Sequence, residues 1–476
     1  MANEVKKRSL PGVWKIGVGL LAVIGILGLG FFLLSSRFVS ANFIAEETEK
    51  NLNCRVQLGD VSWGFPGTLT LTDVRIAPRD KLVADGVKHD ERPPLESEGQ
   101  IEVGLGTVKV DAGGLVTGKL RLREILLEDV VVKSSIDEDG KFSLEDLFEE
   151  TDGEGDADDG EGDESTGTDE EDDSKKVASD KSDSKEKSGE DDGTAVPPTL
   201  DLFRLKNGKF IAHAEETESI IELDGLNIEV RDFDIDPASL EEHRSANVHI
   251  DTAMKIFTED RSFQWAEFNL ETDGEVALLD ETGEFNPDLD YTFVVKKGSR
   301  IADLPTLGKL GQAIGALKNV GIELKALGRK LEFDEDARMV MRLRDGDLSM
   351  LEPGVIHFSG HRLTLDSGSY VQTGNNNHRF EGELLLSDEL SKDAIEESVD
   401  FFVDKVGVNE EIVRPLLMTT FKPALKEARL WLPFVSKEDL SRPKVDLKVK
   451  LKNPIEALEE DSGRTAIKLL EGLLRN

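Results

Sequence analysis

Hydrophobic and polar residues alternate with a period of two along most of the chain. This period is typical of β-strands that bury one face and expose the other to solvent. It is clearest at residues 68–76 and 101–110, with a break in the alternation at Asp73. It recurs at residues 120–132, 220–230, 248–256, 263–270, 291–295, 339–343, 355–365, 380–386 and 445–451. Short strands separated by Gly, Asp and Asn turns predict one long antiparallel sheet, curved or rolled, and disfavour the parallel sheet of an α/β enzyme.

Three stretches depart from this pattern and have the spacing of amphipathic helices, at residues 304–320, 391–428 and 455–474. In the middle stretch we expect a break at Gly407 and a second helix that begins with Asn409 as its N-cap. We interpret all three stretches first as helices that cover the sheet or close its end. Helices that lie on a membrane surface or bind a partner are the alternative.

The most hydrophobic segment lies near the N-terminus. Residues 16–34 contain no charged side chain, and a helix of this length, at about 1.5 Å per residue, spans nearly the ~30 Å hydrocarbon core of a bilayer. Basic residues precede it and acidic residues follow, which predicts a cytoplasmic N-terminus at 1–15, a transmembrane anchor at 16–36 and the rest of the chain on the far side. A cleaved signal peptide ending near residue 41 is the alternative, although its apolar region normally has only about 7–15 residues.

A strongly acidic segment divides the chain. Residues 149–192 hold 21 Asp or Glu against five Lys, with almost no apolar side chains. Such a segment cannot bury enough apolar surface to offset its chain entropy, so we expect a disordered insert over 149–198. No register of Asp152–Glu164 places acidic ligands and a glycine as a calcium-binding loop requires. A solvated linker is the first interpretation, and weak nonspecific cation binding is the alternative.

Composition excludes several classes of function. The chain has 97 acidic and 58 basic residues and a formal net charge of −39, so it repels phosphate backbones and is not expected to bind nucleic acid. Sixteen of these negative charges belong to the acidic insert, and the charge of the rest favours solubility. The single cysteine, Cys54, excludes an intramolecular disulfide and any multi-cysteine metal centre.

Two motifs suggest chemistry that their context does not support. Residues 113–120 (GGLVTGKL) fit seven positions of a phosphate-binding P-loop, but Leu120 stands where Ser or Thr should hold magnesium, and a strand pattern follows. His357 and His361 are four residues apart, which is about 13 Å along a strand, so they cannot ligate one metal there. We interpret them as paired histidines at the surface or at a groove edge.

No other residues suggest catalysis. The remaining histidines, at positions 89, 213, 243, 249 and 378, form no HExxH pair, and Gly-x-Ser-x-Gly is absent from the sequence. Cys54 has no neighbouring histidine in the sequence, and the carboxylates are too numerous for any acid–base pair to stand out. We therefore expect no catalytic residue, no metal site and no cofactor, and we do not expect an enzyme.

Three segments resemble the AsmA-like proteins of bacterial envelopes. The first, residues 52–67 (LNCRVQLGDVSWGFPG), follows the hydrophobic segment and leads into the strand at 68–76. The second, residues 118–148, is similar to the family's strand pair and its closing turn, with Gly140, Ser143 and Leu144 at the turn positions. The third, residues 203–211 (FRLKNGKFI), precedes the alternating stretch at 220–230. The resemblance covers residues 12 to about 231.

This resemblance implies a protein anchored in the bacterial inner membrane, with its bulk in the periplasm and its sheet curled into a groove with an apolar floor. Related chorein-type proteins use such grooves to carry phospholipid acyl chains, and the family's role is in the integrity of the cell envelope and its outer membrane. A structural or assembly factor that docks envelope proteins on the same sheet is the alternative.

The expected lipid-groove residues are apolar side chains on one face of the alternating strands, and ordinary core packing is the alternative interpretation of each. They are Leu69, Leu71, Val103, Leu105, Leu122, Leu223 and Ile228. Beyond the anchor we expect an AsmA-like β region at 41–148, the insert at 149–198, a β-groove region at 199–387, a helical segment at 388–442, and a terminal strand and helix at 443–476.

Overall fold

The structure is a computed structural model that describes residues 41–64, 67–95, 99–111, 121–137, 142–144, 147, 199–215, 217–235, 244–279, 285–302, 322, 330–372, 377–406, 409–439 and 443–449. The expected anchor at 16–36, the acidic insert, the P-loop-like stretch and the helices at 304–320 and 455–474 lie outside these residues. Within the described part of the chain, no helix combines the length and hydrophobicity needed to cross a membrane.

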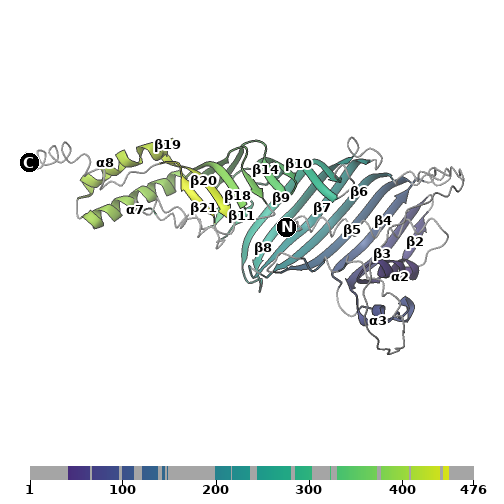
Figure 1. Cartoon of the computed structure of the whole chain (residues 1–476). Helices are drawn as coiled ribbons and strands as arrows, with labels where there is room; N and C mark the ends of the chain where they lie inside the picture. The colour runs from purple at the N-terminus through teal and green to yellow at the C-terminus, as the bar shows by residue number, and fades with distance from the viewer. Residues whose placement is uncertain are drawn as a thin grey trace, which may run out of the picture.

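The described strands form one large open sheet, which confirms a mainly β protein. Figure 1 shows it as a long twisted band, with β2 and β3 at one end and β20 and β21 toward the other. Its first half contains β1 (Cys54–Gln57), β2 (Val61–Gly64), β3 (Thr68–Pro78), β4 (Ile101–Val110), β5 (Arg121–Ile136), β6 (Thr199–Ala214), β7 (Ser219–Ile235), β8 (Arg244–Thr258), β9 (Gln264–Leu279) and β10 (Phe285–Val295). From β3 to β10 each strand pairs with the next along the chain.

One pairing departs from the expected antiparallel sheet. β5 and β6 run parallel, with Leu122 opposite Leu200 and Ile136 opposite Ala214. Parallel neighbours need a long crossover connection, and a short hairpin cannot join them. Here the chain between the two strands contains the acidic insert, so the sheet is mixed and the expectation of a wholly antiparallel sheet was wrong at this position.

The second half of the sheet is built from shorter strands. It contains β11 (Arg300–Ile301), β12 (Leu331–Glu332), β13 (Ala337–Arg344), β14 (Asp347–Met350), β15 (Gly354–Phe358), β16 (His361–Leu365), β17 (Tyr370–Gln372) and β18 (Asn377–Leu385). β10 pairs with β13, and the ladder continues through β14 and β17 to β18. The strand expected at 355–365 is a hairpin of two strands, because the backbone turns at Ser359 and Gly360, both with positive φ.

Two helices follow and close one end of the sheet. α7 (Asp388–Val406) and α8 (Glu410–Phe421) pack on each other and on β18 and β20 (Arg429–Asp439) through Phe402, Leu417 and Leu432. The side chain of Asn409 accepts a hydrogen bond from the backbone N–H of Glu411, which confirms the predicted N-cap. The helical segment is shorter than the expected 388–442, because the chain returns to the sheet as β19 (Leu425–Lys426), β20 and β21 (Lys444–Leu447).

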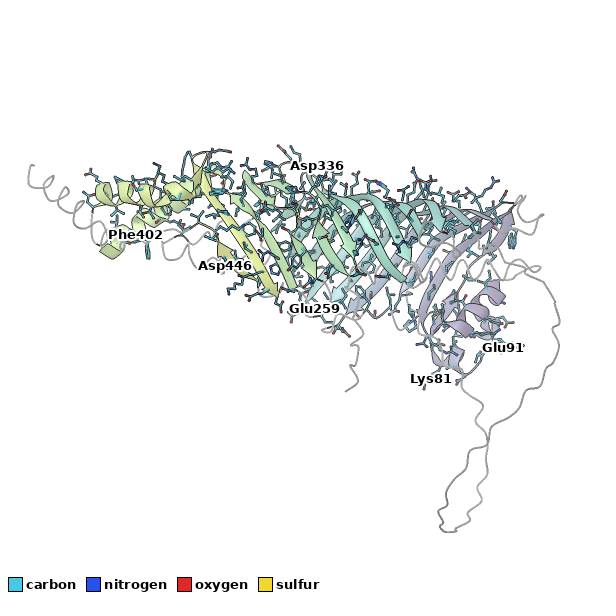
Figure 2. All side chains as sticks on the ribbon, turned by 45° about the horizontal axis from the view of Figure 1, so that its top comes forward. Lys81, Glu91, Glu259, Asp336, Phe402 and Asp446 are labelled. Carbon is cyan, nitrogen blue, oxygen red and sulfur yellow. The ribbon has the colours of Figure 1, made fainter. Side chains whose placement is uncertain are left out.

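The opposite end of the band carries two short helices. α2 (Ala41–Asn51) packs Ile44 and Ala45 into the core of the first strands, and α3 (Lys81–Ala84) begins at Asp80, whose carboxylate accepts from the backbone N–H of Val83. Figure 2 shows this end through the labelled Lys81 and Glu91, and the helical end through Phe402. Among the described residues, the helices therefore lie at the two ends of the sheet.

A line of one-residue irregularities crosses five neighbouring strands. Asp73 on β3, Asp129 on β5, Asn207 on β6 and Gly225 on β7 all have positive φ, and Gly104 on β4 lies against Asp129. Extra residues of this kind are β-bulges, and together they are called the bulge line below. After each bulge the apolar and polar positions of the strand continue with a shift of one residue. The Asn207 side-chain amide donates to the Asp129 carboxylate at 2.5 Å, so side chains link the line between strands.

Candidate functional site: the apolar face of the sheet

One face of the sheet carries a continuous set of apolar side chains from β3 to β14. The apolar face is defined here as the face that carries Leu71, Leu127 and Leu205, which occupy corresponding positions on β3, β5 and β6. Residues directly opposite each other in a ladder point to the same side of a sheet. Following the registers outward from these three leucines therefore assigns every described strand residue to this face or to the opposite one, the charged face.

Four of the seven predicted groove residues are fully buried on the apolar face of the first strands. Leu69, Leu71, Val103 and Leu122 are 2–8% exposed and belong to a single core cluster. Leu223 and Ile228 on β7 are half-buried and pack against the same cluster. The structure thus brings these six side chains together.

Leu105 is the exception and lies on the charged face. It stands opposite Thr72 on β3 and Glu128 on β5. The bulge line passes between Val103 and Leu105, so two residues that are two positions apart point to opposite faces. A strict period of two across IEVGLGTVKV predicted the wrong side for Leu105, and the apolar set on β4 continues instead at Val108 and Val110.

The first strands are closed because other parts of the chain pack over them. Phe142 and Leu147, after β5, are each 1% exposed and lie in the same cluster as the strand side chains. A backbone bridge between Ile136 and Phe142, and the hydrogen bond from the Ser143 N–H to the Ser135 carbonyl, turn this segment back onto the sheet. α2 adds Ile44 and Ala45 to the same cluster. In this region the apolar side chains form a packed core.

The apolar face continues past β7 with a different degree of burial. On β8, β9, β10 and β13 the apolar row is only half-buried over most of its length, although the residue types are as hydrophobic as before. Only small groups of fully buried residues interrupt it, such as Val295 with Ala337. The half-buried row, kept under this name below, consists of Val248, Ile250, Met254, Ile256, Phe268, Leu270, Leu289, Tyr291, Phe293, Met339 and Met341.

Tyr291 shows how apolar this part of the face is. It lies on β10 opposite Gly274 and Met341. Burial raises the pKa of its phenol to about 12, and desolvation is the only cause. A Cβ on Gly274 would come within 2.6 Å of the Tyr291 Cβ, so glycine is needed there to let β10 approach β9 at this position. The tyrosine ring thereby adds to the apolar surface between the two strands.

The charged face of the same strands carries ion pairs that cross between neighbours. Arg342 on β13 donates two hydrogen bonds to the Asp290 carboxylate on β10, which lowers the pKa of that carboxyl. Lys255 on β8 bonds to Asp224 on β7 at 3.0 Å and lowers the pKa of that carboxyl in the same way. The two faces of β8–β13 therefore differ sharply, because the ion pairs lie on one face and the large apolar side chains are concentrated on the other.

Two residues that the sequence analysis considered for chemistry, Cys54 and His361, are buried in the structure. Cys54 is buried at the start of β1, and burial raises the pKa of its thiol to about 12, so it is a poor nucleophile. His361 is also buried, where its Nδ1 accepts from the Ser387 N–H, and desolvation lowers its pKa. Of the two positions expected for this histidine, the surface or a groove edge, the surface position was wrong, because His361 packs against Ser387 and Phe358.

Sequence reasoning missed most of the half-buried row. Its members follow the period of two, but nothing in a single sequence distinguishes a covered apolar row from one that is only half-covered. Comparison with known proteins does not decide the question either, because no protein-family model, no curated protein and no solved structure matches this chain.

Proposed function

We propose that this protein binds lipid acyl chains on the half-buried row of its apolar face, as a membrane-anchored, AsmA-like protein of the bacterial envelope. In this proposal residues 16–36 hold it in the inner membrane, its N-terminus is cytoplasmic and the sheet stands in the periplasm. The protein transfers or holds lipid in support of the outer membrane, and it is not an enzyme.

The observation that carries this proposal is the continuous half-buried row across β8, β9, β10 and β13. Strands lie about 4.8 Å apart, so the row is about 14 Å wide between its first and last strands. Soluble proteins rarely leave a contiguous apolar surface of this kind without an occupant. Lipid tails fit it because they need no hydrogen bonds and adapt to an uneven surface of Met, Phe and Ile.

Charge also favours an apolar occupant. The charged face carries ion pairs such as Arg344 with Asp288, and a net negative charge repels anionic headgroups from the outside of the sheet. Tails would therefore lie on the apolar face while headgroups stay in water at its margin.

Paired substitutions on β13 test this function. Met341 lies on the apolar face, and its neighbour Val340 lies on the charged face between Arg338 and Arg342. Each is changed to Glu in the full chain, and the lipid that co-purifies in detergent is quantified by mass spectrometry. We expect Met341→Glu to lose most of the bound lipid and Val340→Glu to keep it, because only the first places a charge under the tails. Equal lipid content in both variants and the wild type would contradict the proposal.

A second candidate function is the docking of envelope proteins at the edge of the sheet. β2 pairs only with β3 among the described strands, and it exposes 49% of Trp63. An edge strand with an exposed aromatic side chain can accept a strand from a partner. Photo-crosslinkers at Trp63 and at Phe293 separate the two functions, since the lipid proposal predicts lipid adducts at Phe293, and docking predicts protein adducts at Trp63.

A further inference from the structure

Four side chains with metal-ligating atoms meet on the charged face of β8 and β9. His249 and Asp251 alternate on β8, and Asp273 and Glu271 stand directly opposite them on β9. Residues opposite each other in an antiparallel ladder have Cβ atoms about 4.5–5.5 Å apart. Unlike two histidines spaced along a single strand, these residues therefore form a compact square.

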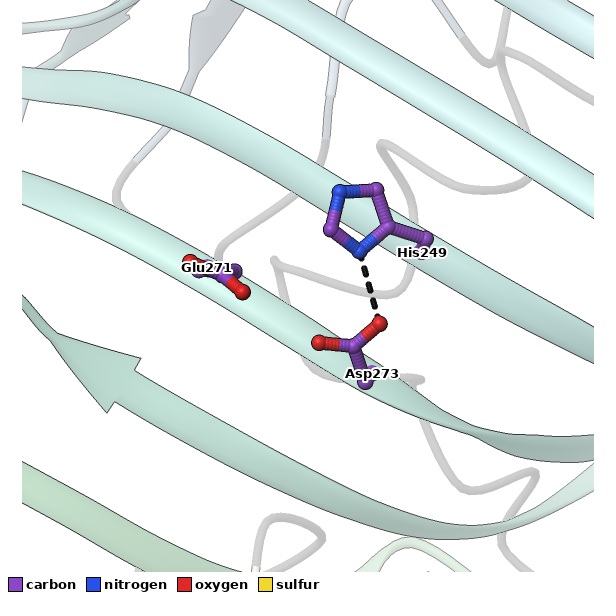
Figure 3. A group of neighbouring side chains, drawn as sticks. All are labelled: His249, Glu271 and Asp273. Atoms are coloured by element: carbon purple, nitrogen blue, oxygen red, sulfur yellow. Dashed lines mark hydrogen bonds and ion pairs between the residues drawn. The ribbon is translucent and has the colours of Figure 1, made fainter.

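The contacts within this square are short. The Nδ1 atom of His249 lies 2.7 Å from Oδ1 of Asp273, and its Nε2 atom lies 3.9 Å from Oδ2 of Asp251. One ligand atom from each of His249, Glu271 and Asp273 can be chosen so that all three lie within 4.8 Å of one another. Figure 3 shows the imidazole and the Asp273 carboxylate joined by their hydrogen bond, with Glu271 on the same strand as Asp273.

These distances are close to those of a bound metal. Zinc bonds of about 2.0–2.2 Å separate neighbouring tetrahedral ligand atoms by roughly 3.3–3.6 Å. A change of about 1 Å in side-chain position closes the remaining gap. The side chains of His249 and Asp273 are 45% and 58% exposed, which leaves room for such a change.

The surrounding charge also favours a cation. Asp251 and Glu271 are like charges directly opposite each other, an arrangement that destabilises a sheet. Glu229, which stands opposite His249 on β7, adds a further carboxylate, although Arg204 and Arg231 bond to it. Among the described residues, Lys296 forms an ion pair with Glu271, and a metal would have to displace it. A bound divalent cation would offset the repulsion and join the two strands.

We propose that β8 and β9 carry a binding site for a divalent transition-metal cation, with zinc as the best fit, formed by His249, Glu271 and Asp273 with Asp251 beside them. Imidazole combined with carboxylates suits zinc and its neighbours, whereas calcium and magnesium prefer oxygen ligands alone. The site lies on the face opposite the half-buried row and does not depend on lipid binding. Sequence analysis expected no metal because the ligands alternate on two strands and form no local motif.

Titration of the full-length protein in detergent with Zn²⁺ tests this site by calorimetry. Co²⁺ in place of Zn²⁺ reports the ligand geometry through its visible absorption. Excess Mg²⁺ is present throughout to occupy weak carboxylate sites, including those of the acidic segment. His249→Ala and Asp273→Asn each remove one ligand. His213→Ala is the matched control, because His213 is also half-exposed and lies 3.3 Å from a single carboxylate, that of Glu259.

We expect one equivalent of Zn²⁺ to bind, and each ligand variant to weaken binding by at least about tenfold while His213→Ala leaves it unchanged. Unfolding midpoints measured without metal establish that the variants remain folded. Absence of saturable Zn²⁺ binding in Mg²⁺, or equal binding by wild type and His249→Ala, would overturn the proposal. Equal weakening in the His213→Ala control would do so as well, since it would show a diffuse acidic surface and not a site.

Discussion

The apolar face that crosses the whole sheet is buried to different degrees on the strands β3–β6 and on the strands β8–β13. In the first group the apolar side chains are almost completely buried, as for Leu127 at 0% and Phe203 at 1% exposure. In the second group Leu270, Phe293 and Met341 are only half-buried. Among the described residues, α2 and the side chains of Phe142 and Leu147 pack on the first group, and no described helix packs on the second. Alternation creates an apolar face, and the covering segments decide whether it becomes a core or a surface.

The largest expected effect is on the free energy of unfolding, when a leucine is changed to alanine in each of the two regions. Leu127→Ala removes a fully buried side chain and should lower the free energy of unfolding by about 2–5 kcal/mol. Leu270→Ala removes a half-buried one, and we expect less than half that loss because the side chain is already partly in contact with solvent. Denaturant unfolding of the full chain measures both. Equal losses would show that the two regions are packed alike and would remove the distinction between them.

The bulge line gives the next largest effect, because it crosses β3–β7 and ends before β8. Asn207 has a positive φ of 52° and bonds to Asp129. Asn207→Val places a β-branched residue in this conformation and should cost about 1–3 kcal/mol of stability. Asn207→Gly tolerates the backbone and loses only the side-chain bond, so its loss should be clearly smaller. Thermal unfolding separates the two variants, and a valine variant as stable as the glycine variant would argue against a strained bulge here.

The smallest expected effect is the pH dependence of stability that His361 on β16 contributes. Burial, together with the nearby Arg429, lowers the pKa of His361 below its usual 6.5, against the opposing charge of Asp334. As pH falls below about 6.5, His361 therefore binds a proton in the unfolded chain but not in the folded chain. The free energy of unfolding declines as a result until the pH reaches the lowered pKa of the folded state. Above pH 6.5 this contribution is constant. Unfolding midpoints measured from pH 7.5 to pH 5 should show a shallower decline in His361→Asn than in the wild type, and parallel curves would contradict this.

The sequence predicted the elements better than their arrangement. The ends of β4 and the N-cap at Asn409 followed from alternation and capping chemistry, which act locally. The parallel pairing of β5 and β6 could not be predicted, since it depends on where the chain returns after residue 198. The outward position of Leu105 required the bulge between Val103 and Leu105 to be recognised, and the meeting of His249 with Asp273 required the register of two strands. Each miss concerns a contact between distant residues that no local pattern encodes.

The central claim is that the half-buried row contacts lipid while the charged face of the same strands does not. β10 tests it most directly, because Tyr291 and Phe293 point to one face while Asp290, Thr292 and Val294 point to the other. A photo-crosslinking amino acid is placed at each of these positions in turn in the intact membrane-bound protein, and lipid adducts are measured by mass spectrometry. The account predicts adducts that alternate with a period of two, strong at 291 and 293 and weak at 290, 292 and 294. Adducts at every position, or at none, would contradict it.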